Sequence, residues 1–105
     1  MTDIEIPWSN VIIEFIGTFV FLSVIMNVAF KGHGGVLTPL AIGLALTVAI
    51  YMLIHDGATC HFNPAVSFMS WLKGDTASKV LGIFVVAQLA GAAAAYGLHT
   101  YVVKQ

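Results

Sequence analysis

The stretch HDGATCHFNPAVSFMSWL, residues 55–72, decides the fold of this chain. Its first part, residues 55–61, is too polar and irregular for a spanning helix. Its second part, residues 63–72, is apolar enough to enter a membrane, but a helix of this length rises only about 14 Å, half of a hydrocarbon core about 30 Å thick. Non-helical backbone is tolerated at that depth only where it is buried in protein or lines a water-filled cavity. Residues 55–72 therefore predict a re-entrant loop and half-helix beside a cavity.

The half-helix has a recognisable start at Asn63, Pro64 and Ala65. Asn is a preferred N-cap, and Pro suits the first helical position, where no amide hydrogen is needed. A half-helix that begins at the bilayer centre places the partial positive charge of its amino end there. The Asn63 side chain can cap with its carbonyl oxygen and still offer its amide hydrogens to a passing oxygen atom. The same tripeptide also starts ordinary helices, so its meaning depends on this setting.

Long apolar stretches lie on both sides of this segment, at residues 11–30, 36–54 and 80–103. Each has the length of about 20 residues that a spanning helix needs. The chain is 59% hydrophobic and 9% charged, and the second stretch carries no charge, which argues against a soluble helical bundle. We therefore expect an all-α transmembrane protein with three spanning helices and one re-entrant half-helix. It would be an integral, multi-pass protein of the lipid bilayer. Residues 1–10 are expected to form an N-terminal tail, and Asp75 or Thr76 is expected to cap the third span.

Charge and residue spacing argue against several other classes of protein. The chain has four Lys, no Arg and a formal net charge of −1, which does not fit a nucleic-acid partner. Asp56, Cys60 and His61 lie close in sequence but lack the spacing of a zinc site, so we expect no metal and no other cofactor. No nucleophile and base stand in an obvious pair. The sequence therefore predicts that the protein is not an enzyme.

Three short motifs, taken together, resemble the major intrinsic protein family, the aquaporins and glycerol facilitators. EFIGT at residues 14–18 is similar to the family's first-helix signature, and HFNPAV at residues 61–66 is similar to its first Asn-Pro-Ala loop. AQLAG at residues 87–91 is similar to its third-helix signature. The resemblance covers about residues 11–103 and is specific because the three motifs occur in the family's order. It implies half of an aquaporin-like fold, namely a single repeat of the N-terminal type.

The resemblance also implies which residues would line a pore. Asn63, followed by Pro64 and Ala65, would donate hydrogen bonds at the midplane to water or a small neutral solute such as glycerol. The remaining lining would be a ladder of backbone carbonyl acceptors and a filter position on the second span: Thr59, Cys60 and His61 for the ladder, and Ile42 or Gly43 for the filter.

Two polar residues inside spans, Glu14 and Gln88, are expected to be structural. The resemblance implies that Glu14 braces the re-entrant loop by accepting hydrogen bonds. A charge within a span costs about 2.5–3.5 kcal/mol and marks an interior partner, which agrees with that role. Alternatively, Glu14 lies near enough to the interface to snorkel, because it is only four residues into the span. Gln88 either forms a hydrogen bond between helices or simply packs.

The sequence departs from the family pattern in three respects. It has one Asn-Pro-Ala where the family has two, and it has no Arg, so the usual filter cation is missing. Its segment at residues 55–61 is one residue longer than the family's usual spacing between two His residues. The first departure raises the question of whether a pore forms, and the other two leave the selectivity open.

A second copy inserted upside down would complete the pore wall, because one repeat alone exposes half of that wall to lipid. Lys73 and Lys79 fall on one side of the membrane and Lys31 and Lys104 on the other, so the charge rule for orientation has almost nothing to act on. We therefore expect a passive channel assembled from two or more copies, with an antiparallel homodimer as the conducting unit and a higher oligomer as an open alternative. The small residues at every fourth position of the third span suit close helix contact, either between copies or within one chain: Ala87, Gly91 and Ala95. Two alternatives are a non-conducting protein that binds or regulates a full-length aquaporin-like channel, and a remnant that forms no pore.

Overall fold

The computed structural model describes residues 5–104, and this part of the chain is helical with no strand. Four α-helices follow one another, and the first and last continue into short π-helical turns. The elements are α1 (Trp8–Ile25), η1 (Met26–Phe30), the 3-10 turn η2 (Gly35–Leu37), α2 (Thr38–Leu53), α3 (Pro64–Lys73), α4 (Ser78–Gly97) and η3 (Leu98–Val102).

Three continuous helical segments are long and apolar enough to cross a membrane, which confirms the predicted spans. They cover Trp8–Phe30, Gly35–Leu53 and Ser78–Val102, with 23, 19 and 25 residues. The boundaries differ from expectation by a few residues. Residues 8–10, which we assigned to the tail, already belong to α1, and the third span begins at Ser78 rather than at residue 80.

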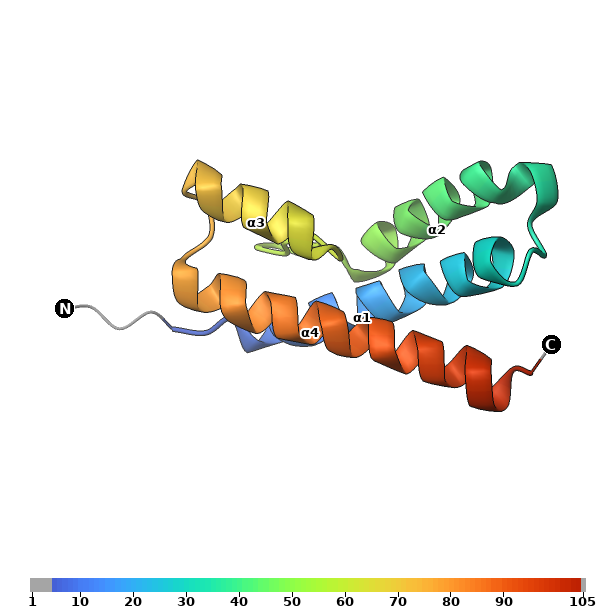
Figure 1. The fold of residues 1–105 in the computed structure, drawn as a ribbon. Coiled ribbons are helices and arrows are strands. Elements are labelled where there is room, and N and C mark those ends of the chain that lie inside the picture. Colours follow the sequence, from blue (N-terminus) through green and yellow to red (C-terminus); the bar gives the residue numbers. More distant parts are fainter. Residues whose placement is uncertain (1–4, 105) are drawn as a thin grey trace.

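Figure 1 shows α1 and α4 running alongside each other, with α3 and α2 on the same side of this pair. α3 packs on α4 and α2 packs on α1, so that the two shorter helices cover opposite halves of the long pair. The amino end of α3 lies midway along the molecule, and its carboxyl end lies where α4 begins (Figure 1). With 10 residues, α3 rises about 15 Å, so it is a half-helix, as predicted.

Small residues on α4 allow α1 to approach closely. A side chain at Gly91 would come within 2.7 Å of the Phe15 carbonyl oxygen and 3.1 Å of the Phe19 amide nitrogen, both on the backbone of α1. Ala87 and Ala95 are buried on the same stripe. In this structure the stripe therefore serves packing within one chain.

The turn between α3 and α4 differs from the predicted cap. α4 begins after Ala77, and neither Asp75 nor Thr76 caps it. The Thr76 hydroxyl is engaged with the Ser70 hydroxyl at 2.6 Å, and Asp75 forms an ion pair with Lys73 at 2.7 Å. The hydrogen bond from Lys73 to Asp75 raises the pKa of Lys73. Both candidate caps are thus occupied by partners on the side of α3.

The outer surface is apolar, and the small interior holds as many polar as apolar side chains among residues 5–104, unlike the core of a soluble protein. In α2 only Ala45 and Ala49 are buried, and large side chains such as Leu40, Val48 and Tyr51 are exposed. A surface of this kind needs lipid or another protein beside it. The protein is an integral membrane protein that spans the bilayer three times.

Candidate functional site

The amino end of α3 carries a capped helix start. Asn63 has extended backbone dihedrals, and its Oδ1 accepts a hydrogen bond from the Ala65 amide at 2.8 Å. Pro64 occupies the first helical position, where it lacks only a hydrogen that the helix does not use. The Asn63 side chain is exposed, and no acceptor among residues 5–104 engages its Nδ2. Two amide hydrogens therefore remain available at the end of the half-helix.

A buried carboxylate holds the re-entrant loop in place. Glu14 on α1 is completely buried, and its two oxygens accept four hydrogen bonds. Oε2 accepts from the Thr59 hydroxyl at 2.7 Å and the His61 amide at 2.9 Å. Oε1 accepts from the Phe62 amide at 2.7 Å and from Gln88 Nε2 at 3.0 Å. Because successive backbone N–H groups converge on one anion, the loop forms a concave anion site around a residue of its own chain.

The loop backbone adopts an unusual conformation on either side of His61. Cys60 and Phe62 have φ angles of 50° and 54°, in the left-handed region that side chains other than Gly rarely occupy. Each such residue costs about 1–3 kcal/mol unless its surroundings enforce the conformation. The bonds from the neighbouring amides to Glu14 are what enforce it here.

The Phe62 ring fixes the loop against α1. Phe62 is 1% exposed, and its ring fills the space above Gly17. A side-chain carbon added at Gly17 would lie 2.1 Å from Phe62 Cε1, so only Gly fits under this ring.

Ser67, which the sequence analysis did not single out, connects the loop to α4. Its hydroxyl oxygen accepts a hydrogen bond from Gln88 Nε2 at 2.8 Å and lies 2.8 Å from His61 Nδ1. The His61 ring meets Phe84 edge-on, with ring centroids 5.8 Å apart. Asn10 was also missed, and its Nδ2 donates to the Gly57 carbonyl oxygen at 2.9 Å. Asn10 lies one helical turn before Glu14, and this spacing on the same face of α1 could have identified it as a second contact to the loop.

The two candidate filter residues lie on α2, away from these bonds. Ile42 is half-buried and Gly43 is exposed, and a side chain added at Gly43 would meet no atom within 4 Å. The space next to Gly43 is therefore open in a single copy.

The comparisons with known proteins bear on this geometry. A family model described as "Major intrinsic protein" matches residues 2–105, nearly the whole chain. No solved structure matches the chain significantly. Because this match covers nearly the whole chain, the chain belongs to the major intrinsic protein family, whose members are channels for water or small solutes.

Proposed function

We propose that this protein is a passive channel for water or small neutral solutes, with two copies in antiparallel orientation forming the conducting unit. The observation that carries the proposal is the Asn63 amide at the amino end of α3. Its Oδ1 is used by the cap at Ala65, and its Nδ2 has no acceptor within the described residues. A passing water oxygen would satisfy that donor.

The wall around Asn63 would combine donors and acceptors. Pro64 and Ala65 would shape the end of the half-helix, and the carbonyls of Thr59, Cys60 and His61 would lead solute toward it. The positive amino end of α3 would repel cations and protons. Ile42 or Gly43 would form the filter, and an apolar or absent side chain at this position would favour a wide one.

Glu14 and Gln88 would brace this wall rather than contact solute. Their bonds to Thr59, His61, Phe62 and Ser67 leave Glu14 buried and its oxygens occupied. A rigid loop keeps its carbonyls at fixed positions, which a narrow pore requires.

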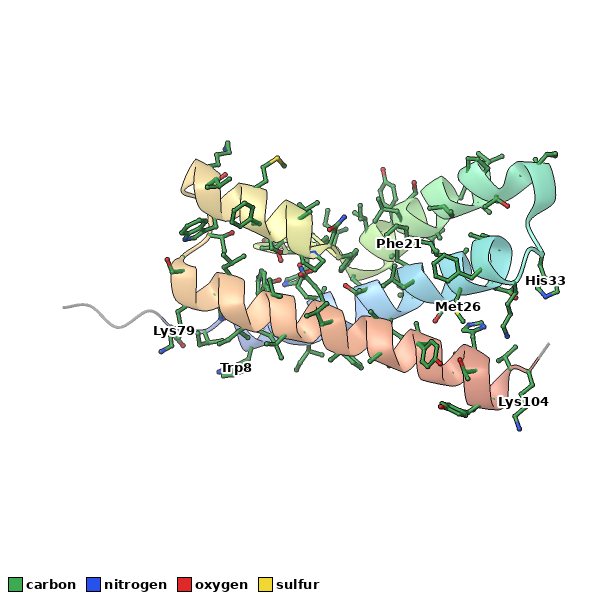
Figure 2. The ribbon with its side chains drawn as sticks, in the orientation of Figure 1. Trp8, Phe21, Met26, His33, Lys79 and Lys104 are labelled. Carbon is green, nitrogen blue, oxygen red and sulfur yellow. The ribbon has the colours of Figure 1, made fainter. Side chains whose placement is uncertain are left out.

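A second copy would cover the exposed side of α3. Phe68, Met69 and Leu72 are each more than half exposed there, next to the polar loop. Lys79 lies at one end of the molecule and Lys104 at the other (Figure 2), which agrees with a chain that can insert either way. Two opposed copies would place two half-helix amino ends face to face.

Osmotic swelling of liposomes that contain the purified protein tests conduction. Asn63→Asp is the informative variant because a carboxylate oxygen still caps Ala65 but offers no amide hydrogens. We expect permeability above the lipid background for the native protein, and permeability at that background for Asn63→Asp and Asn63→Leu. Asn27→Ala serves as a control on the same chain. Native protein without permeability, combined with tight binding to a longer family member, would support a regulator instead.

The assembly is tested separately with topology reporters on each terminus. Dual insertion predicts that each terminus is found on both sides of the membrane. A single orientation for all copies would rule out the antiparallel dimer without ruling out conduction by another assembly.

A further inference from the structure

An apolar groove of about 490 Å³ runs along the outer side of the α1–α4 pair. It begins beside Trp8 at the start of α1 and follows one face of α4. The lining on α4 recurs at helical spacing: Ser78, Lys79, Gly82, Ile83, Val86, Ala87 and Ala90. Gly82 and Ala90 hollow out the groove, and a side chain added at Gly82 would meet nothing within 4 Å.

The mouth of the groove is polar and positively charged. Figure 2 shows Trp8 and Lys79 near one another, on the side of α4 turned away from α3. Trp8 is 61% exposed, and Trp is enriched at the level of lipid headgroups. Within residues 5–104 one ion pair forms, between Lys73 and Asp75. Lys79 therefore has no acidic partner among these residues. The Ser78 hydroxyl accepts from Trp71 Nε1 at 2.8 Å and keeps its own hydrogen for another acceptor.

We propose that this groove binds one anionic phospholipid, with an acyl chain along Gly82 and the phosphate at Lys79 and Ser78. The occupant must be apolar where it lies along residues 82–90 and anionic at its Lys79 end, and it must be present at the membrane interface. An anionic phospholipid has all of these properties, and its charge complements Lys79. A zwitterionic lipid would fill the same groove but would gain less from the ammonium group.

Fluorescence quenching at Trp8 tests the site directly. The chain has two Trp residues, so Trp71→Phe leaves Trp8 as the reporter. In this background the Ser78 hydroxyl loses its bond from Trp71 and keeps its own hydrogen for the phosphate. This chain is placed in phosphatidylcholine vesicles that contain equal fractions of either brominated phosphatidylglycerol or brominated phosphatidylcholine. One lysine near the surface is worth about a fivefold preference, so brominated phosphatidylglycerol should compete about fivefold better for the groove.

Three further variants separate the parts of the proposal. Lys79→Gln should abolish the preference and leave quenching by phosphatidylcholine unchanged. Gly82→Leu should fill the groove and reduce quenching by both lipids. Lys104→Gln, at the opposite end, should change neither.

Equal quenching by the two lipids, or a preference that survives Lys79→Gln, would overturn the proposal. Protection of Trp8 from both lipids would show that protein covers the groove, which also overturns it. The assay measures no transport, so its outcome is independent of whether the channel conducts.

Discussion

The first half of the span Trp8–Phe30, which joins α1 and η1, buries Asn10, Glu14, Gly17 and Thr18, whereas none of residues 19–30 is buried. The first half faces the re-entrant loop and α4 through directional polar bonds, and we call this region the loop end. The second half faces α2 and part of α4. It ends in a π-helical turn at the same end of the molecule as the similar turn that follows α4 (Figure 1), and we call this region the turn end. There the Lys31 ammonium donates to the Val103 carbonyl oxygen at the surface.

The two ends differ in how their helices are held together, because the surrounding solvent is lipid. In a bilayer, apolar contact between helices gains little over contact with lipid, so hydrogen bonds and close backbone packing specify the structure. The loop end has both, through Glu14 and Gly91. At the turn end the side chains are half-exposed or exposed, so lipid or another copy of the chain would contact them.

The largest expected effect comes from removing the centre of the loop end. Glu14→Ala removes the acceptor of four hydrogen bonds and leaves the Thr59 hydroxyl and the His61 and Phe62 amides unpaired, and each buried orphan costs about 1–3 kcal/mol. We expect the free energy of unfolding to fall by more than about 3 kcal/mol, seen as a lower unfolding temperature in detergent micelles. Glu5→Ala, at an exposed position, should leave that temperature unchanged. A Glu14→Ala protein as stable as the native one would refute the importance of the brace.

Substitution of Gly by Ala should lower the free energy of unfolding at the loop end and raise it at the turn end. Gly17→Ala forces a carbon into the Phe62 ring, and overpacking of this kind costs about 1–3 kcal/mol. Gly97→Ala meets nothing within 4 Å and should gain up to about 1 kcal/mol in helix propensity. Thermal unfolding of both variants measures the contrast. Equal changes in the unfolding temperature of the two variants would mean that the Phe62 ring does not hold the loop against α1.

A smaller difference is expected between two asparagines on the same helical segment. Asn10→Ala loses the bond to the Gly57 carbonyl, which is worth about 1 kcal/mol. Asn27 lies at the turn end, and its side chain bonds to no partner among residues 5–104. Hydrogen exchange should therefore rise around residue 57 in Asn10→Ala and stay at the native level in Asn27→Ala. Unchanged exchange in both variants would argue that Glu14 alone holds the loop.

The smallest effect is expected at the surface of the turn end. Lys31→Gln removes an exposed bond, and such changes stay within about 0.5 kcal/mol. Its unfolding temperature should match that of the native protein. A large loss would show that the two π-helical turns depend on this lysine.

Much of the fold was predictable because the thickness of the bilayer fixes how many apolar residues a helix needs to cross it. The three spans and the half-helix starting at Asn63 followed from segment length and from one Asn-Pro pair. The cap of α4 was mispredicted because side-chain preference does not reveal competing partners. Asp75 is held by Lys73, and Thr76 is held by Ser70.

The details of the loop were beyond sequence reasoning for a different reason. Cys and Phe normally avoid positive φ, so the residue types at positions 60 and 62 do not predict their left-handed backbone conformation. Ser67 and Gly17 become informative only once the loop is known to lie against α1 and α4. Their roles depend on contacts between segments that are far apart in sequence.

The bond between Glu14 and Gln88 joins positions that are 74 residues apart. A ribosome synthesises Glu14 and the loop before Gln88, so the last donor of this cluster emerges after the loop. Until then Glu14 lacks the hydrogen bond from Gln88 and Ser67 lacks its bond to α4, so these polar groups favour water over hydrocarbon. We therefore expect the half-helix to sink into the bilayer as the final step of biogenesis, after its carboxyl-terminal neighbour has crossed.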